Sequence, residues 1–384
     1  MRSPEKPKMR YSPIDLAKER KAPKIFVKDI FGKVFFDYNN VVYSVLGVKG
    51  AGKSATLEVI ATRYPKVLDL GSSIDGENLA WLRSGMVKNP LLICSDNVRL
   101  KTSFDWKKIS EVRLKDILEH DFIISTPAFY MKPYEIGRPE EEFQAIQRII
   151  AVLWQRKVID EYWYLLFREA PNYFYSRIGL GVDEQTAAKK KFIEVARESR
   201  HFGLALGLDM LRYTAVEIDL RELSDYIIFK ALGPTKLDER LRWIFAFVNP
   251  YFLRDLPKPY AVIEHEGNIA VAYFEYPKWH KKVEEGVSIF ESLGIEIVHE
   301  VEGAVDMEKV EKVARSEAGE ISEKTEEAIE EESEIKEEIK VEPDKVEKFP
   351  DNRFDSKDLE NLDSIIKFLN RAGFRSKTDK SDSD

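Results

Sequence analysis

The segment GVKGAGKS has the types and spacing of residues that bind phosphate, G-x-x-x-x-G-K-[S/T]. It follows the apolar run VVYSVL and precedes the helical pattern ATLEVIATRY, which is the context such a loop requires. Glycines let backbone N–H groups turn toward phosphate oxygens, and the positive end of the following helix adds to the attraction. Lys53 would neutralise the β- and γ-phosphates of ATP, and Ser54 would ligate Mg²⁺. The predicted nucleotide-binding residues are Gly47, Val48, Lys49, Gly50, Ala51, Gly52, Lys53 and Ser54.

A loop of this kind works with acids at the end of a second strand, one holding Mg²⁺ through water and one activating the attacking water. The apolar run YWYLLF ends in Arg168 and Glu169 instead of two acids. Glu169 is therefore the predicted catalytic base. A guanidinium cannot hold Mg²⁺, so either Asp209 or Asp69 supplies the missing carboxylate, with Asp209 preferred, or turnover is slow. Arg168 is expected to pair with Glu169 or with a phosphate of an adjoining subunit.

Apolar runs alternate with amphipathic segments along most of the chain. The clearest helix begins at Pro139 with an acidic first turn and repeats apolar residues up to Trp154. This alternation predicts an α/β fold, a mainly parallel sheet with helices on both faces. One hairpin is expected around Phe31-Gly32, and a C-terminal β-hairpin turns at Glu266-Gly267-Asn268. The predicted strands are 41–46, 67–70, 91–94, 122–125, 163–167, 204–208 and 226–229.

The 384 residues divide by composition into four parts. Residues 1–22 are basic and rich in proline, without helical or strand periodicity, and are predicted to form a flexible arm. Residues 23–300 carry the alternating pattern and form the expected P-loop ATPase domain. Residues 301–354 form an acidic low-complexity linker, and residues 355–384 hold a short amphipathic helix and a disordered end. The apolar stripe of that helix consists of Leu359, Leu362, Ile365, Ile366 and Leu369.

Several classes of protein are excluded by composition. The single cysteine, Cys94, rules out a disulfide framework and a cysteine-built metal site, and the five histidines show no metal-binding spacing. No apolar run is long enough for a membrane span, and the first twenty residues have no apolar signal region. The expectation is a cytoplasmic protein without a membrane partner.

The order of these motifs resembles the HerA/FtsK superfamily of DNA-pumping ATPases. The most specific segment is VARESRHFGLALGLDMLRYTAVEIDLRELSDYIIFK. In it, residues 200–203 match a basic turn of that family, Arg212 matches the arginine that follows its sensor strand, and Ile218-Asp219 match the next element. The REA ending of the second strand and the segment DLGSSIDGENLAWLR are most similar to HerA-like ATPases of archaeal plasmids and viruses. The resemblance covers about residues 40–275.

The resemblance implies a P-loop NTPase fold of the RecA/ASCE type that hydrolyses ATP with Mg²⁺. It also implies a homo-oligomeric ring, expected to be a hexamer, that acts on double-stranded DNA. Arg197, Arg200 and Arg212 are the candidates for an arginine that reaches the γ-phosphate within or between subunits, although Arg197 alone is better explained as part of a solvated basic helix end. One departure from the family is that Met210-Leu211 stand where it has Thr-Gln, a polar sensor of the γ-phosphate.

Three functions remain open at this stage. The first is an ATP-driven translocase of double-stranded DNA, of the packaging type, in which Lys189, Lys190 and Lys191 either contact phosphates or form a solvated helix face. The second, favoured by the departures at Arg168 and Leu211, is a nucleotide-gated scaffold with weak or no hydrolysis that recruits a protein partner through its acidic tail and tail helix. The third is a small-molecule kinase that uses the same loop.

Overall fold

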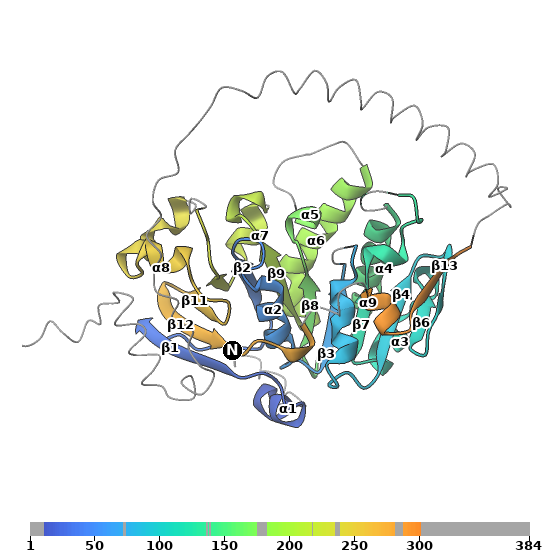
Figure 1. The fold of residues 1–384 in the computed structure, drawn as a ribbon, viewed down its shortest axis with the longest axis horizontal. Coiled ribbons are helices and arrows are strands. Elements are labelled where there is room, and N and C mark those ends of the chain that lie inside the picture. Colours follow the sequence, from blue (N-terminus) through green and yellow to red (C-terminus); the bar gives the residue numbers. More distant parts are fainter. Residues whose placement is uncertain are drawn as a thin grey trace, which may run out of the picture. The chain divides into compact units, whose positions relative to one another are not determined.

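The computed structural model describes residues 11–71, 74–135, 137, 140–174, 183–216, 218–234, 239–280 and 287–300. Within these residues lie an 11-stranded sheet (Figure 1) and a separate pair of strands. The predicted acidic linker at 301–354 and the predicted helix in 355–384 lie outside the described residues. Those two segments therefore stay predictions.

The centre of the sheet is parallel, as the alternating pattern predicts, and every apolar run predicted to be a strand is one. Its strands are β2 (Val42–Leu46), β3 (Lys66–Leu70), β4 (Pro90–Cys94), β6 (Asp105–Lys108), β7 (Phe122–Ser125), β8 (Trp163–Phe167), β9 (Leu204–Met210) and β10 (Tyr226–Phe229). They lie in the spatial order β10-β2-β9-β8-β3-β7-β4-β6, and all neighbours are parallel. The phosphate-binding loop thus follows a strand in the interior of the sheet.

One edge of the sheet is antiparallel. Strand β10 pairs with β11 (Tyr260–His265), which forms the predicted C-terminal hairpin with β12 (Asn268–Phe274). Strand β1 (Ile25–Phe31) then pairs with β12, from Ile25 opposite Phe274 to Phe31 opposite Ile269. The prediction of a hairpin around Phe31-Gly32 is wrong, because the residues that follow Gly32 form no strand up to β2 in the described chain. Phe36 instead packs its ring against Tyr43 and Tyr226.

A smaller sheet pairs β5 (Val98–Lys101) with β13 (Glu296–His299) in antiparallel fashion. Both strands are four residues long, and charged residues interrupt their apolar pattern. They are missing from the predicted strands because so short an alternation is hard to distinguish from a loop.

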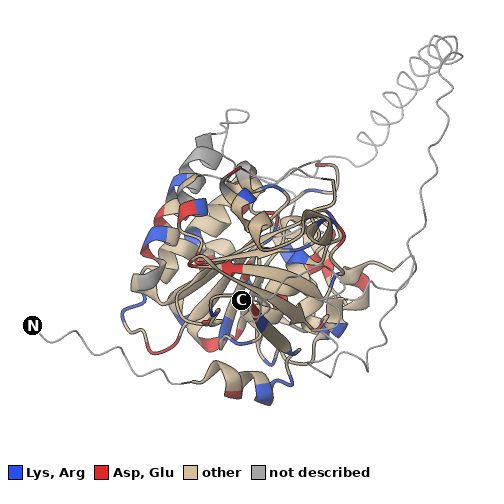
Figure 2. Ribbon diagram, turned by 90° about the vertical axis from the view of Figure 1, so that its left-hand side faces the viewer, with Lys and Arg blue, Asp and Glu red and all other residues tan. Residues whose placement is uncertain are grey.

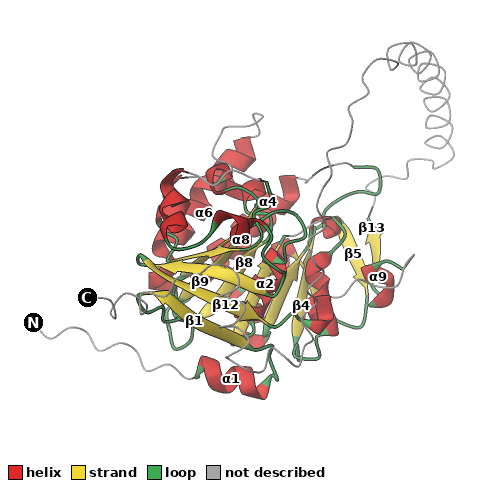
Figure 3. Ribbon diagram, turned by 60° about the vertical axis from the view of Figure 1, so that its left-hand side comes forward, coloured by secondary structure: helices red, strands yellow, loops and turns green. Residues whose placement is uncertain are grey.

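Helices cover both faces of the parallel sheet (Figure 3). Helix α2 (Lys53–Ala61) packs with alternate strand residues such as Val45 and Leu166 in one apolar cluster. The next residue of β8, Phe167, points to the other face, where its ring lies against those of Tyr173 and Phe174 in α5 (Pro171–Phe174). Helices α4 (Glu140–Leu153) and α6 (Asp183–Phe202) pack together and, with α5, cover that face. The helix predicted to start at Pro139 is therefore confirmed as α4.

The predicted basic arm includes a short docked helix, α1 (Pro13–Glu19). The guanidinium of Arg20 donates to Tyr64 O at 2.6 Å and to Pro65 O at 3.1 Å, beyond the C-terminal end of α2. A cation at this position satisfies backbone carbonyls and favours the negative end of the helix. Residues 11–22 therefore differ from the expected flexible arm, whereas residues 1–10 lie outside the described part.

Shorter helical segments connect the strands, and the first of them, η1, carries residues of the candidate site. They are η1 (Glu77–Arg83), η2 (Ile109–Glu111), α3 (Leu114–Glu119), η3 (Pro127–Phe129), η4 (Tyr213–Ala215), α7 (Ile218–Glu222), η5 (Glu239–Ala246), α8 (Pro250–Arg254), η6 (Lys278–His280) and α9 (Ile289–Ser292). None of the helices in the described residues combines the length and the apolar character that crossing a membrane would need.

Candidate nucleotide site

Charged residues are scarce on the strands of the sheet (Figure 2), so those that are buried there are informative. Asp69, Arg168 and Asp209 are at most 1% exposed. They lie near the carboxyl ends of β3, β8 and β9, which are neighbours in the sheet. Ligands bind at this edge of open parallel sheets, and the predicted phosphate-binding loop lies at the same edge, after β2.

The loop from Gly47 to Ser54 joins β2 to α2. Gly50 and Gly52 adopt left-handed backbone conformations, with φ of 78° and 87°, which glycine adopts without a steric penalty. The ammonium group of Lys53 donates to Val48 O at 3.3 Å, across the loop. The segment therefore has the tight turn and the lysine position that a phosphate-binding loop needs.

Asp209 connects the loop to the end of β8. One of its carboxylate oxygens accepts a hydrogen bond from Ser54 Oγ at 2.8 Å, and the other accepts one from the backbone N–H of Glu169 at 2.6 Å. Burial raises the pKa of Asp209, although the charge of Lys53 and these two hydrogen bonds oppose the rise. A single carboxylate thus fixes the predicted metal ligand and the predicted base relative to each other.

The Ser54 hydroxyl and the Asp209 carboxylate fit a magnesium ion, which prefers oxygen ligands. Within the described residues, no cluster of three or more His, Cys, Asp or Glu side chains is placed to hold a metal. A site completed by nucleotide oxygens and water does not need such a cluster, because Mg²⁺ is usually bound by one or two protein groups plus phosphates.

Glu169 lies at the exposed carboxyl end of β8. Its backbone φ of 51° is in the left-handed region, which is uncommon for a residue other than glycine. The hydrogen bond from its N–H to Asp209, and a second one from Ala170 N–H to Asp209 O at 2.8 Å, hold this turn. Such strained positions are found where the surrounding structure determines them, often at functional sites.

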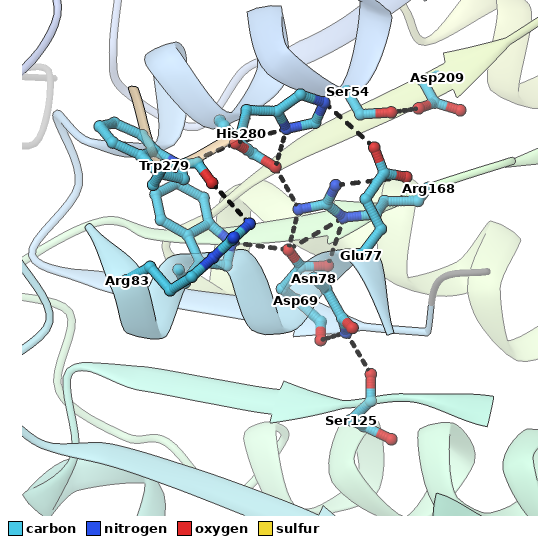
Figure 4. A network of polar contacts seen from close by, with 12 residues as sticks. Ser54, Asp69, Glu77, Asn78, Arg83, Ser125, Arg168, Asp209, Trp279 and His280 are labelled. Atoms are coloured by element: carbon cyan, nitrogen blue, oxygen red, sulfur yellow. Dashed lines mark hydrogen bonds and ion pairs between the residues drawn. The ribbon is translucent and has the colours of Figure 1, made fainter. Parts of the chain in front are cut away.

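Arg168 occupies a buried ion-pair network instead of the nucleotide site (Figure 4). Its Nη2 lies 2.7 Å from Glu58 Oε1 of α2 and 2.7 Å from Asp69 Oδ2, and its Nε also donates to Asp69. Its Nη1 has no hydrogen-bond partner among the described residues and lies 3.9 Å from Glu77 Oε2. The expected pairing with Glu169 or with a neighbouring subunit is therefore replaced by pairs within the chain.

Asp69 is fully engaged in this network. Trp81 of η1 donates its Nε1–H to Asp69 Oδ2 at 2.7 Å, and Arg168 contacts both oxygens. Of the two carboxylates considered for the metal, Asp69 is thus committed to Arg168, whereas Asp209 contacts the serine of the loop.

A segment after β12 closes the network from the other side. The Trp279 Nε1–H donates to Glu58 Oε2 at 2.8 Å, and the ring of Trp279 stacks on Trp81 at 5.6 Å. His280 lies 3.2 Å from Glu58 through Nδ1 and 3.2 Å from Glu77 through Nε2. Burial disfavours the charged imidazole, but the bonds to Glu58 and Glu77 outweigh it and raise the pKa of His280 to about 9.

Glu77 is the acid of this network that lies nearest to solvent, with a side chain 41% exposed. Partial burial opposes its charged form, yet His280, Arg168 and Lys53 together lower the pKa of Glu77 to about 2. Lys53 makes the smallest of these contributions, and it is the one that comes from the loop. Glu77 therefore joins the Arg168 network to the candidate site.

The arginine candidates are less completely described. Arg212 follows β9 with an exposed side chain, at the same edge of the sheet as the loop. Leu211, where the family has a polar sensor, is 43% exposed. Arg200 belongs to the last turn of α6, and its side chain lies outside the described part, as do those of Lys189 and Lys191.

Three ionisable residues of the network are absent from the sequence-based predictions: Glu58, Glu77 and His280. The sequence does contain a signal for Glu58, because this residue interrupts the apolar run of ATLEVIA. In the structure it is fully buried. A buried glutamate in that position needs a cation as its partner, and Arg168 was the cation whose partner the sequence did not identify. His280 gave no such signal, since only the fold brings it to α2.

No family model matches the chain, and no curated protein sequence does either. Among solved structures, the genome packaging NTPase B204 from Sulfolobus turreted icosahedral virus 2 with AMP is 16% identical, with a TM-score of 0.35, and the match covers 62% of this chain and 98% of that one. The pCW3 conjugation coupling protein TcpA is 14% identical, with a TM-score of 0.36 and coverage of 65% and 66%. The cytoplasmic domain of the Thermomonospora curvata Type VII secretion ATPase EccC is 12% identical, with a TM-score of 0.34 and coverage of 66% and 26%.

The chain has the α/β fold of a P-loop NTPase, with a parallel sheet and a loop between an interior strand and a helix. The likeness to a packaging NTPase and a coupling protein is distant. At TM-scores of 0.31 to 0.36 it carries no further conclusion about this chain.

Proposed function

We propose that this protein is an ATPase that couples hydrolysis of ATP to movement of double-stranded DNA. The observation that carries the ATPase part is the position of Asp209, which contacts both Ser54 of the loop and the backbone of Glu169. Loop, metal-binding pair and exposed acid are thereby held in one arrangement, which is what hydrolysis of a phosphoanhydride requires.

In the proposed mechanism, the backbone N–H groups of the loop and the ammonium of Lys53 bind the phosphates. Ser54 and Asp209 would hold Mg²⁺, which neutralises phosphate charge when bound. Glu169 accepts a proton from the attacking water, and the hydrogen bond to Asp209 holds its backbone relative to the loop. Arg168 takes no part in metal binding, because Asp69 and Glu58 occupy its guanidinium.

The DNA and ring parts of the proposal rest on the sequence resemblance alone. A ring, expected to be a hexamer, would place arginines of one subunit beside the ATP of the next. Arg212 and Arg200 are the proposed residues, and the exposed position of Arg212 after β9 is compatible with that role.

The test is steady-state ATP hydrolysis with Mg²⁺, with and without double-stranded DNA. We expect Lys53→Ala to abolish nucleotide binding, and Glu169→Gln to retain binding of ATPγS while lowering kcat by roughly 10²–10⁴-fold, the usual contribution of a general base. Lys101→Ala and Glu296→Gln are matched controls, because this exposed pair lies in the small sheet. Unchanged turnover in Glu169→Gln would exclude Glu169 as the general base. A rate of ATP hydrolysis that does not depend on DNA would exclude the proposed DNA motor.

The second candidate is a nucleotide-gated scaffold that binds ATP and hydrolyses little of it. It is favoured by Leu211, an exposed apolar residue in place of a polar sensor, and by Arg168, which stands where the resemblance predicts an acid that orders the metal. The same assay separates the two functions. A scaffold binds ATPγS in a Lys53-dependent manner yet shows no turnover, with or without DNA.

A further inference from the structure

A second lysine lies beneath the phosphate-binding loop. Lys230 follows β10 directly and is only 1% exposed. Its backbone N–H donates to Leu46 O at 2.7 Å, and the carbonyl of Ala231 accepts a bond from Val48 N–H at 2.8 Å. These bonds continue the pairing of β2 with β10 into the loop, so the backbone of Lys230 is fixed to that of the loop.

The side chain of Lys230 runs along the loop from its first glycine to its last. A Cβ atom on Gly47 would lie 2.8 Å from the Cβ of Lys230, and a Cβ atom on Gly52 would lie 3.9 Å from its Cε. A side chain at Gly47 would therefore collide with Lys230. The aliphatic stem fills the space that these glycines leave open.

The ammonium group of Lys230 lacks a counter-ion among the described residues. Nζ donates to the carbonyl of Lys258 and lies 6.0 Å from the centre of the Phe274 ring. Burial lowers the pKa of Lys230 to about 7, and no neighbouring charge contributes to that shift. The charged groups on the surrounding elements are Lys49 and Lys53 of the loop, Lys258 itself, Glu264 and His265 of β11, Glu275 after β12, and Arg254 and Asp255, which pair with each other in solvent. None of them contributes to the pKa shift of Lys230.

A buried cation without a counter-ion is costly, and proteins rarely keep one without a function. The nearest place where anionic charge would arrive is the other side of the loop, where the proposed nucleotide puts its phosphates. We infer that Lys230 is a second cation of the phosphate site, a positioning residue whose counter-charge is the polyphosphate of the bound nucleotide, acting through the backbone of the loop. This inference rests on the nucleotide binding proposed above.

The inference has a consequence that a purely structural lysine would not share. Without ligand, the amine of Lys230 is partly neutral near pH 7, and the arriving polyanion favours its ammonium form. Nucleotide binding therefore takes up one proton from solvent onto Nζ at alkaline pH. By linkage, the Kd of the wild type rises by up to about tenfold per pH unit above pH 7.

The experiment measures binding of ATPγS to the full chain from pH 7 to pH 9. Calorimetry in two buffers of different ionisation enthalpy counts the protons taken up at pH 8. We expect Lys230→Arg, which keeps its charge, to bind tightly at every pH without extra proton uptake. Lys230→Met is expected to bind weakly at every pH.

Lys66 provides a matched control, because it is also a buried lysine that donates to backbone carbonyls, those of Leu118 and His120. Burial lowers the pKa of Lys66 to about 8, but this residue begins β3 and so lies at the opposite edge of the sheet. Lys66→Met should keep the pH profile and the proton uptake of the wild type.

A flat pH profile and no Lys230-dependent proton in a wild type that binds ATPγS would overturn the inference alone, whether or not the variants fold. Absence of any nucleotide binding by the wild type would overturn the proposed function, and the inference with it. Proton uptake that Lys66→Met removes and Lys230→Met retains would also overturn it.

Discussion

Two buried cations lie close to the phosphate-binding loop, and their surroundings differ in the supply of carboxylates. Arg168 contacts Glu58 and Asp69 directly and has Glu77 nearby, and it lies in a network closed by aromatic and histidine side chains. Lys230 has one backbone carbonyl and the face of one ring. Burial alone therefore does not reveal what a cation does. Arg168 has its counter-charges within the network without any ligand, whereas the charge of Lys230 is left for a ligand to balance.

The largest effect is expected from removing Arg168, which tests whether this cation has the structural role that separates it from Lys230. Arg168→Met leaves Asp69 and Glu58 buried without their cation, so we expect a loss of roughly 3–5 kcal/mol in the free energy of unfolding, measured by urea denaturation. Arg242→Met, at an exposed arginine, should stay within about 0.5 kcal/mol of the wild type. A loss below about 1 kcal/mol for Arg168→Met would contradict the structural role.

The stability of the ligand-free protein at alkaline pH tests the other cation. The folded state holds the pKa of Lys230 near 7, well below its unfolded value, so it binds fewer protons than the unfolded state between pH 7 and pH 10. Wild-type stability should therefore rise across this window by up to about 1.4 kcal/mol per pH unit relative to Lys230→Met. Parallel curves for the two proteins would show that Lys230 keeps its charge when folded.

His280 should produce the opposite pH dependence. Its folded pKa of about 9 lies above its unfolded value, so its contribution is complete below about pH 6.5 and is lost as the pH rises through 9. We expect His280→Asn to cost about 2–3 kcal/mol at pH 6 and close to nothing at pH 10, measured by denaturation at both values. An equal cost at both pH values would mean that packing, and not charge, is what His280 provides.

The smallest expected effect separates one hydrogen bond from the rest of the network. Trp279→Phe keeps an aromatic ring beside Trp81 but removes the N–H donor to Glu58, so we expect a loss of about 1 kcal/mol in unfolding free energy. Tyr276→Phe, at a partly exposed ring next to this segment, serves as the control. Equal effects of the two substitutions would show that the bond to Glu58 contributes nothing of its own.

The central sheet and the loop were predictable from local sequence because buried parallel strands are nearly continuous apolar runs. Strand β1 was predictable as a strand, but its pairing was not. Its partner β12 is distant in sequence, whereas the sequence pattern suggested a hairpin with the residues directly after Gly32. The choice of Asp209 over Asp69 rests on which neighbour each carboxylate meets, Ser54 or Arg168. Sequence shows both acids at strand ends, but it does not show those contacts.

Lys230 is a second residue whose surroundings could not be predicted from the sequence. A lysine directly after the apolar strand YIIF reads as the point where a strand emerges into solvent. In the structure it is buried, because the segment after β10 continues alongside the loop instead of leaving the sheet. The sequence shows that Lys230 is charged, but it does not show that the described residues place no carboxylate against its ammonium group. That depends on elements from three separate parts of the chain.

The cap formed by Trp279 and His280 also bears on the order in which the protein folds. These residues contact Glu58 across 221 and 222 positions of sequence, so a chain emerging from the ribosome must reach His280 before Glu58 of α2 gains these two partners. Contacts of such separation form late, because the entropy of closing the intervening loop opposes them until the rest is in place. A nascent or truncated chain that stops short of His280 leaves the carboxylate of Glu58 half-satisfied next to the loop. The Arg168 network beside the candidate nucleotide site is therefore completed only after His280 has been synthesised.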